Sequence, residues 1–424
     1  MNVRTKAELE KIQKARQQKI YQELLGQDTD IIFEDALEND MVLNMGPQHP
    51  ATHGVLRLVL RLDGETIIKC VPELGYLHRG YEKMGENTTF HEFMPHTDRL
   101  DYLSPMSNNV AISLAIDNAL GIEAPPRAQW IRVLVSELAR ISSHLMAMGS
   151  TCMDVGALTV LIWTFTEREK LYDIFEKICG ARFTTSFGRI GGVANDVSPE
   201  AISMIKTWAD DFTNQLDYSG KLVHRNRIFV NRMGGIGILE KEKALQLGIT
   251  GPMLRATGVT RDLRRDMPYL VYDQFDFDVI TESDCDCYSR YMVRVKEMYE
   301  SLKIVQQCIE KMPEGDVRIN DPKHSLPKKA EVYTKMEELI NDFMLINFGA
   351  APEEGETYTA IEAPKGELGF HYVSVGEGHP WKLKIRSPSA SNLQSLSHMV
   401  EGSMLSDVVA IIGSIDPVMG EADK

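Results

Sequence analysis

Four stretches of the chain carry apolar residues at the spacing of amphipathic helices. The clearest follows Pro125-Pro126, and Gly149 is predicted to end it. Its apolar positions are Trp130, Leu134, Leu138, Ile141, Leu145 and Met148. Further helices are predicted over 158–179 before Gly180, from Ser198-Pro199 onward, and over 288–311 before Pro313. Together they predict a helical bundle in the middle of the chain.

Two other regions show the patterns of β-strands. Residues 55–62 place leucines at alternate positions and arginines between them, and Asp63-Gly64 then separates this run from 66–71, which predicts a hairpin. The leucines are Leu56, Leu58, Leu60 and Leu62, and the arginines are Arg57 and Arg61. Short strands broken by Gly and Pro are expected at about 357–387. The predicted class is α+β, a central bundle flanked by β-rich regions at both ends.

Four segments are expected along the chain. Residues 1–40 are predicted to be a docking arm and linker, with an amphipathic helix carrying Leu9, Ile12, Ile20 and Leu24. The body divides into an N-terminal β-rich region at 41–124, the bundle at 125–330, and a C-terminal α/β region at 331–424.

Composition limits the partners. The 424 residues are 43% hydrophobic, which is ample for a large core, and the net charge is -15. Such an acidic chain is a poor candidate for nucleic acid or an anionic membrane surface. No apolar run reaches the ~18 residues that a membrane span needs, so any membrane association is expected to come through partners. No secretory signal is seen, and six scattered cysteines favour a reducing compartment.

The densest group of candidate residues is the loop 46–54, GPQHPATHG, which holds His49 and His53. A Gly/Pro-rich loop before a strand can present an imidazole to a cavity, where it can act as a proton donor near neutral pH. Histidines in such turns are nevertheless more often structural. A helical pair of zinc ligands is disfavoured because Pro50 lies between the two histidines.

Two further candidate functional residues are Tyr102 and Asp154. Tyr102, in the run 98–103, is a possible phenolic donor, and the plainer interpretation is a half-buried Tyr. Asp154 lies in an apolar stretch where a carboxylate needs a partner, and the plainer interpretation is a helix N-cap. Gly234-Gly235-Ile236-Gly237 and Cys285-Asp286-Cys287 are too short to indicate a dinucleotide or metal site.

Longer strings resemble one family, the 49-kDa subunit of respiratory complex I. They follow one another in order from residue 41 to the end. The strings are GPQHPATHGVLRLVLRLDGE from 46, LHRG at 77–80, DRLDYLSPM at 98–106, PPRAQWIRVL at 125–134, RDLRRDMPYLVYDQFDFDV at 261–279, YTAIEAPKGELG at 358–369 and SDVVAIIGSIDPVMGE at 406–421.

This family is similar to the large subunit of nickel–iron hydrogenases, which implies a hydrogenase-like fold. The four positions that hold metal-binding cysteines in hydrogenases carry other residues here. They are Asp101, Ser104, Val418 and Glu421. Without thiolates there is no soft ligand set for nickel and iron, so no metal is expected and an active hydrogenase is contradicted.

The resemblance implies a quinone pocket in the place of that metal site. In the family a His and a Tyr flank the quinone headgroup, and they correspond to His53 and Tyr102. An Asp that orients the His corresponds to Asp154 and would favour its charged form. Quinone reduction would leave the pocket more negative, and this charge change is our hypothesis for the trigger of loop movement coupled to a proton pump. Val418, Met146, Ser150 and His49 are further candidates for the pocket lining, with core packing as the alternative.

The electron donor implied by the resemblance is a 4Fe–4S cluster in a neighbouring subunit, since this chain is expected to bind no cofactor itself. Arg79 matches a family Arg close to that cluster. Thr184 stands where many members carry a His, which predicts weak pH dependence of the cluster potential and a lower-potential quinone such as menaquinone. The expected partners are the iron–sulfur subunit, the 30-kDa subunit and the membrane subunit at the quinone entry. The expected location is the cytoplasmic side of a bacterial inner membrane.

Two alternatives remain at this point. The same subunit type occurs in ferredoxin- or deazaflavin-linked quinone or phenazine reductases, and this chain would see the acceptor rather than the donor. A non-catalytic scaffold derived from a hydrogenase is the other. The presence of His53, Tyr102 and Asp154 together argues against a scaffold.

Overall fold

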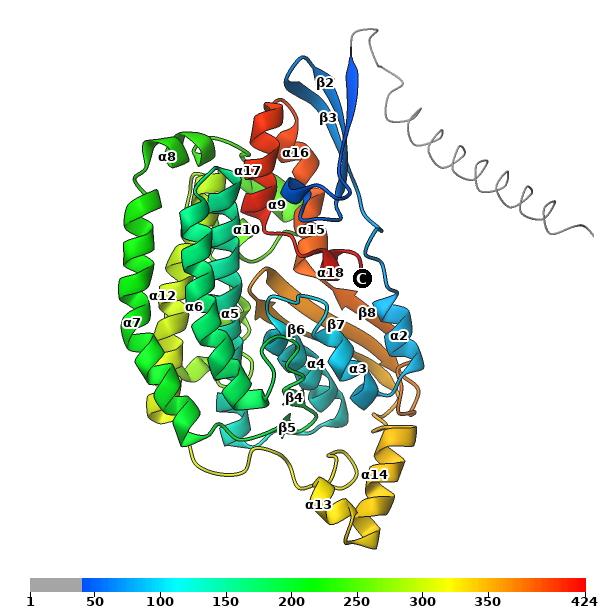
Figure 1. The fold of residues 1–424 in the computed structure, drawn as a ribbon. Coiled ribbons are helices and arrows are strands. Elements are labelled where there is room, and N and C mark those ends of the chain that lie inside the picture. The colour runs from blue at the N-terminus through cyan, green and yellow to red at the C-terminus, as the bar shows by residue number, and fades with distance from the viewer. Residues whose placement is uncertain (1–39) are drawn as a thin grey trace, which may run out of the picture.

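The computed structural model describes residues 40–424, so the predicted N-terminal arm lies outside the described residues. Long helices run side by side along one flank of the body, with one sheet at an end and another beside the helices (Figure 1). None of the helices described is long and apolar enough to cross a membrane. The mixed α+β class is confirmed.

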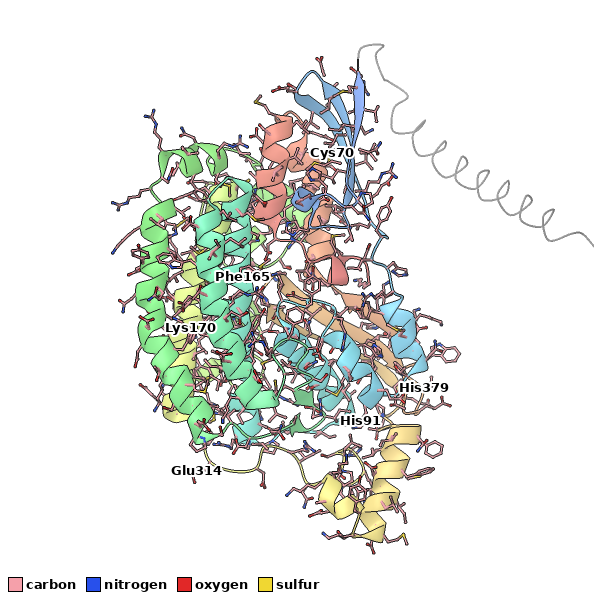
Figure 2. All side chains as sticks on the ribbon, in the orientation of Figure 1. Cys70, His91, Phe165, Lys170, Glu314 and His379 are labelled. Atoms are coloured by element: carbon pink, nitrogen blue, oxygen red, sulfur yellow. The ribbon has the colours of Figure 1, made fainter. Side chains whose placement is uncertain are left out.

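Four long helices form the bundle. They are α5 (Pro126–Asp154), α6 (Leu158–Cys179), α7 (Pro199–Val223) and α12 (Cys287–Lys311). The predicted bounds of α6 are confirmed, and Gly180 ends it in the left-handed conformation with φ +82°. Ser198 caps α7, because its side chain accepts a hydrogen bond from Ala201 N. Lys170 of α6 reaches across to Asp211 of α7 at 3.5 Å, within the bundle (Figure 2).

The prediction that Gly149 ends the first helix is wrong, because α5 continues to Asp154. A Cβ at Gly149 would lie 2.3 Å from Thr164 Oγ1, so the glycine permits close approach of α6 instead of ending α5. The extension places Met146, Ser150 and Asp154 four residues apart, on one face of the helix. Asp154 is therefore the last residue of α5 and not an N-cap, and Ala157 occupies the cap position of α6.

The predicted hairpin forms the N-terminal sheet. Its strands are antiparallel, in the order β1 (Met41–Met45), β2 (Arg57–Asp63) and β3 (Thr66–Glu73). The leucine face of β2 is fully buried, and Arg61 on the other side pairs with Asp40 at 2.6 Å.

The segment after this sheet is helical, which the β-rich description of 41–124 did not anticipate. Three helices occupy it, namely α2 (Tyr81–Asn87), α3 (Phe90–Thr97) and α4 (Pro105–Leu120). A capping box between Thr89 and Glu92 starts α3, and Gly121 ends α4.

The C-terminal strands are confirmed as an antiparallel sheet against which α4 packs. They are β6 (Gly355–Ala363), β7 (Gly366–Ser374) and β8 (Lys382–Arg386). Four helices follow, namely α15 (Pro388–Gln394), α16 (Leu396–Val400), α17 (Leu405–Ile415) and α18 (Met419–Ala422). Helix α17 packs on α5 and α12, so the end of the chain returns to the bundle.

Shorter elements connect these layers. They are η1 (Pro50–Thr52), β4 (Gly188–Arg189), β5 (Gly192–Val193), α8 (Arg227–Met233), α9 (Lys241–Gln246), α10 (Pro252–Arg255), α11 (Leu263–Asp266), η2 (Tyr272–Gln274), α13 (Lys329–Val332) and α14 (Met336–Phe348).

A network of buried ion pairs joins the bundle to β6. We call it the arginine cluster, and its members are Glu137, Arg140, Arg255, Asp262, Arg264, Glu297 and Glu362. Arg255 lies at its centre, with Glu297 and Glu362 each 2.7 Å away. Arg264 pairs with Asp262 at 2.7 Å and with Glu137 at 3.2 Å.

The charges of the arginine cluster are nearly balanced. Burial disfavours the ionised form of Glu137, but Arg140 and Arg264 outweigh it and lower the pKa of Glu137 to about 2. The pKa of Glu297 is also lowered, chiefly by Arg255 against the effect of burial. Burial raises the pKa of Glu362, although Arg255 opposes the shift, so four carboxyl groups share three guanidinium groups in this cluster.

Candidate functional site

The histidine loop is held in a fixed shape by its own backbone. Gln48 N donates to Gly54 O at 2.8 Å, and a Cβ at Gly46, where φ is +84°, would lie 2.2 Å from Leu56 O. His53 adopts the left-handed conformation, with φ 51°, after the short helix η1. This helix contacts α17. The loop therefore presents the half-buried His53 toward the C-terminal helices.

His49 has a local role in the same loop. It is exposed, and its Nδ1 accepts a hydrogen bond from Ala51 N at 3.2 Å, which caps η1.

Tyr102 lies in the turn between α3 and α4. Its neighbour Asp101 is fully buried and accepts a hydrogen bond from Leu103 N at 3.1 Å, which fixes the turn. The half-buried Tyr102 ring lies 6.5 Å from the ring of Phe183. A Cβ at Gly420 would come within 3.4 Å of Tyr102 Cδ1, so the C-terminal segment passes directly beside the phenol ring.

Residues from three parts of the chain form a second buried group, the carboxyl cluster, which consists of Asp101, Lys365, Asp416 and Glu421. Lys365 Nζ lies 2.7 Å from Asp416 Oδ2 and also donates to Ser143 Oγ. Glu421 Oε1 accepts from Ser389 N at 3.1 Å and from the Ser389 hydroxyl. Glu421 Oε2 and Asp101 Oδ2 have no hydrogen-bond partner in the part of the chain described.

Burial favours the protonated forms of Glu421 and Asp101 in the carboxyl cluster. Burial, with a further contribution from nearby Asp101, raises the pKa of Glu421 to about 7. The pKa of Asp101 is also raised by burial, although Lys365 opposes the shift. Burial raises the pKa of Asp154 to about 7. Near neutral pH the site therefore holds carboxylic acids as well as carboxylates.

The charge of Asp416 affects the pKa values of both candidate proton donors, His53 and Tyr102. Burial lowers the pKa of His53, while Asp416 raises it and Lys365 lowers it. The pKa of His53 is lowered overall, so its imidazole is neutral near pH ~7. The family resemblance had instead implied that the charged form is favoured. Burial raises the pKa of Tyr102, and Asp101 and Asp416 add to this, so the phenol keeps its proton.

Asp154 does not hydrogen-bond to His53 among the residues that the structure describes. Its carboxylate instead lies against Gly413 of α17, where a Cβ would be 2.7 Å from Asp154 Oδ2. The half-buried Asp154 and the histidine loop thus contact the same helix, α17, from different elements.

Three of the predicted lining residues lie on elements that contribute to this region, Met146 and Ser150 on α5 and Val418 at the start of α18. Met146 is half-buried, and its sulfur lies 3.5 Å from Arg168 Nη1. Ser150 Oγ donates to Met146 O at 2.9 Å. Val418 is 1% exposed, and its N–H donates to Ser389 Oγ at 3.3 Å.

Arg79 and Thr184, the two residues predicted to lie near an iron–sulfur cluster of a neighbouring subunit, are found at the side of the site. Arg79 is exposed in a loop that the C-terminal segment holds, because Asp423 accepts from Gly75 N at 2.6 Å and from Leu77 N at 2.8 Å. Thr184 follows Phe183, whose ring contacts Tyr102.

Sequence reasoning missed Lys365 and treated Asp101, Asp416 and Glu421 only in relation to absent cysteines. The available signal for Lys365 was a lysine at a Pro- and Gly-containing turn, Ala363-Pro364-Lys365-Gly366, between two expected strands. Across residues 40–424 no group of three or more His, Cys, Asp or Glu is arranged to hold a metal ion.

Fold and site together define a large α+β protein whose ionisable groups meet where N-terminal loops contact the C-terminal segment. The family model described as "Respiratory-chain NADH dehydrogenase, 49 Kd subunit" matches residues 154–424. A D-type NADH-quinone oxidoreductase subunit of Chloroherpeton thalassium is 56% identical over 97% of this chain and 94% of its own length. The corresponding protein of Salinibacter ruber is 54% identical over 92% of this chain and 87% of its own length.

The chain therefore belongs to the family of the 49-kDa (D-type) subunits of NADH-quinone oxidoreductase. It is one subunit of a multisubunit oxidoreductase, and the resemblance seen in the sequence is confirmed.

Proposed function

We propose that this chain forms the pocket for the quinone headgroup in a proton-pumping NADH:quinone oxidoreductase and supplies protons to the reduced quinone. The observation that carries the proposal is that the histidine loop and the tyrosine turn both lie against the C-terminal segment, η1 on α17 and Tyr102 beside Gly420. The charge of Asp416 acts on both His53 and Tyr102 there. Imidazole and phenol suit the two carbonyl oxygens of a quinone, because each can donate a hydrogen bond and then a proton.

Reduction of the quinone takes two electrons and two protons. Tyr102 is protonated at neutral pH, because its pKa is raised, and it is the proposed donor to one carbonyl. Neutral His53 can donate to the other only if another acid replaces its proton promptly. Glu421 and Asp154, each with a pKa raised to about 7, are the proposed sources.

Asp154 is proposed as a positioning residue for the histidine loop. Its contact with Gly413 and the contact of η1 with α17 support a role transmitted through that helix. Transfer of protons to the quinone leaves the carboxyl cluster more negative, and we propose that this change moves the loops that face the membrane pump.

The electrons are proposed to come from a 4Fe–4S cluster in a neighbouring iron–sulfur subunit, near Arg79 and Thr184. Further proposed partners are the 30-kDa subunit and the membrane subunit at the quinone entry. The proposed location is the cytoplasmic face of a bacterial inner membrane, with attachment through those partners. His49, Met146, Ser150 and Val418 are proposed to border the pocket.

The deciding experiment measures quinone reduction by the assembled enzyme with Tyr102→Phe and with His53→Ala. We expect a loss of about 10²-fold or more in each, the scale of removing a general acid. NADH-to-ferricyanide activity is the internal control, since it does not need the quinone site. Tyr218→Phe, at a ring that is 53% exposed on α7, is the matched control.

Normal quinone reduction in both variants, with assembly intact, would contradict the proposed pocket. The chain would then act as a scaffold around a pocket formed by other residues.

The identity of residue 184 gives a separate test. With Thr184 the potential of the neighbouring cluster is expected to change little between about pH 6 and about pH 8, because no protonatable imidazole lies there. Thr184→His is expected to introduce the pH dependence. Redox titration of the cluster signal measures both, and a steep dependence in the unaltered enzyme would contradict the proposal.

A further inference from the structure

Two short helices project from the body below the C-terminal sheet (Figure 1). We call residues 329–348, which contain α13 and α14, the projecting segment. Eight of its large apolar side chains are exposed, from 46% at Ile346 to 76% at Tyr333. The others are Met336, Leu339, Ile340, Phe343, Met344 and Phe348. Leu345 is the buried residue of α14. A continuous apolar surface of this kind marks a site of protein contact.

The projecting segment is attached firmly at its end. The backbone of Phe348 and Gly349 lies against Gly378, where a Cβ would be 1.6 Å from Phe348 O. Gly349 has φ +74° and its N–H donates to Leu345 O at 3.0 Å, which ends the helix. Helix α14 also contacts α3. The apolar side chains are therefore presented from a fixed base.

The charges around the projecting segment select its partner. Residues 329–356 contain seven acidic and two basic side chains. An anionic membrane surface would be repelled by this excess, and so would a second copy of a chain whose net charge is -15. An apolar groove rimmed by Lys and Arg is complementary in both respects.

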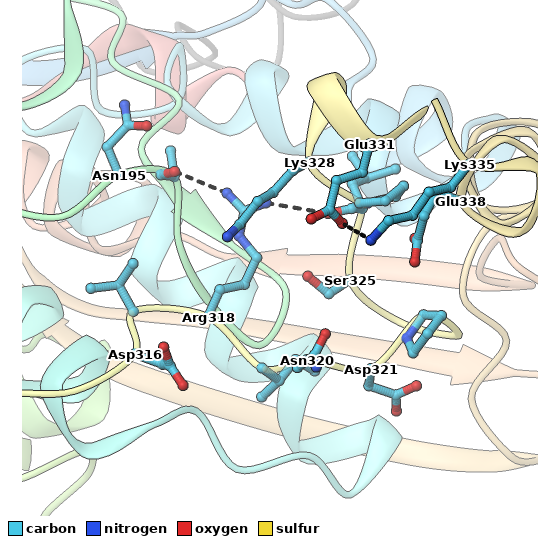
Figure 3. Close-up of a pocket in the computed structure, with 16 residues that line it drawn as sticks. Asn195, Asp316, Arg318, Asn320, Asp321, Ser325, Lys328, Glu331, Lys335 and Glu338 are labelled. Carbon is cyan, nitrogen blue, oxygen red and sulfur yellow. Dashed lines mark hydrogen bonds and ion pairs between the residues drawn. The ribbon is translucent and has the colours of Figure 1, made fainter. Parts of the chain in front are cut away.

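A cleft of about 690 Å³ adjoins the projecting segment (Figure 3). Its walls are residues 316–328 on one side and α13 and α14 on the other. Arg318 is occupied by carbonyl groups, since it donates to Ala194 O at 2.9 Å and to Leu326 O at 3.3 Å. Lys335 pairs with Glu331 at 3.6 Å on the wall that α13 and α14 form, whereas Asp316 is exposed on the opposite wall. The cleft extends the surface and adds the acidic groups of Asp316 and Glu338, together with a further exposed lysine, Lys328.

We propose that the projecting segment and this cleft are the docking surface for another subunit of the same oxidoreductase, which presents an apolar groove flanked by Lys and Arg. The proposal does not depend on the quinone pocket, so the results with Tyr102→Phe and His53→Ala have no bearing on it.

The first test replaces Phe343 with a photocrosslinking benzoylphenylalanine in the assembled, purified enzyme. Mass spectrometry of the adduct is expected to identify an apolar segment of another subunit with Lys or Arg close by in its sequence. The same replacement at Ile228, an exposed residue of α8 at 69%, is the control for accidental proximity. An adduct with a second copy, with lipid or with an acidic segment would overturn the proposal, as would the absence of any protein adduct.

The second test measures assembly. Phe343→Asp combined with Phe348→Asp is expected to lower the yield of complete enzyme at least about tenfold, which corresponds to ~1.4 kcal/mol of docking energy. Phe343→Leu should keep the yield, because it keeps the apolar surface. The matched control is Ile228→Asp combined with Leu245→Asp, at similarly exposed positions of α8 and α9.

All of these side chains are exposed, so the circular dichroism and melting of the altered chain should match the parent. A complete enzyme with every subunit at normal ratio in the Phe343→Asp, Phe348→Asp variant would overturn the proposal.

Discussion

The arginine cluster and the carboxyl cluster are both buried, but most carboxyl groups of the first have lowered pKa values and those of Asp101 and Glu421 in the second are raised. In the arginine cluster guanidinium groups lie within 2.7–3.2 Å of Glu137, Glu297 and Asp262 and lower their pKa values. In the carboxyl cluster, Lys365 is the close cation and pairs with Asp416. The pKa of Glu421 there is raised to about 7.

The difference teaches that burial alone does not determine whether a carboxyl group stabilises a fold or holds a proton. Of the carboxyl groups paired with arginines, Glu137, Glu297 and Asp262 are held in the ionised state, whereas Glu362 of β6 keeps a raised pKa in spite of Arg255. A buried carboxyl group with few cations nearby, such as Glu421, exchanges its proton near neutral pH, which suits proton donation but costs stability when the group ionises.

The largest expected effect comes from removing the centre of the arginine cluster. Arg255→Met leaves Glu297 and Glu362 buried without their cation, and we expect a loss of about 3–5 kcal/mol of unfolding free energy. Denaturant unfolding of the purified chain measures it. Arg261→Met is the control, because its pair with Glu367 is half-exposed and is expected to contribute no more than about 1 kcal/mol. Equal losses in the two variants would remove the distinction between buried and surface pairs.

Replacement of a glutamate by glutamine should change the stability of the fold much more in the arginine cluster than in the carboxyl cluster. Glu137→Gln is expected to cost about 3 kcal/mol at neutral pH, because the pKa of Glu137 is lowered to about 2 in the fold. This difference should disappear as pH falls from about 4.5 toward about 2, where Glu137 itself is protonated.

Glu421→Gln is instead expected to change stability by no more than about 1 kcal/mol near pH ~6, where Glu421 is mostly protonated. It should remove an ionisation near pH ~7 from the pH profile of quinone reduction. Comparable destabilisation by Glu137→Gln and Glu421→Gln at that pH would show that the clusters do not differ as described.

Asp154→Asn tests the cost of a raised pKa. The folded state binds the Asp154 proton more tightly than the unfolded state, so its contribution to stability is full below about pH 4 and is lost as pH rises through about 7. The Asn variant should therefore be more stable than the parent at about pH 8, by about 1–2 kcal/mol after solvent screening, and similar at about pH 4. Unfolding midpoints at the two pH values check this, and a constant difference would contradict it.

The smallest expected effect concerns the packing of α17. Gly413→Ala brings a methyl group to 2.7 Å from Asp154 Oδ2, so the carboxylate must shift by a few tenths of an ångström. We expect quinone reduction to fall by about threefold, since small misplacements at such a site are felt in the rate. Ser406→Ala, at an exposed position of the same helix, is the control. Unchanged rate and pH profile for Gly413→Ala would argue against a positioning role for Asp154.

Local signals predicted the elements whose limits are set within their own sequence. Gly180 and Ser198 mark the ends of α6 and α7 through backbone conformation and capping, and both were visible in the sequence. Gly149 misled because its role depends on Thr164, a residue of another helix. Helices α2 and α3 were missed because they are short and their stability comes from packing on the distant β8 and on α4.

The site was only partly predictable for the same reason. His53 and Tyr102 were identified by family motifs, and the structure shows that both sense Asp416, as no local pattern indicated. Lys365 is separated from Asp416 by two strands and three helices along the chain. The lowered pKa of His53 follows from burial by these remote segments, which neither motif nor spacing reveals.

The contact of Asp423 with Gly75 spans 348 residues of sequence and has a consequence for biosynthesis. A ribosome completes the histidine loop, the tyrosine turn and most of the bundle before residues 416–423 emerge. Until then neither His53 nor Tyr102 has its common neighbour Asp416, and the loop before Arg79 has no anchor. A chain whose residues 416–423 are still inside the ribosome thus offers its assembly partners no formed site, so the emergence of this segment sets the earliest moment at which the site can exist.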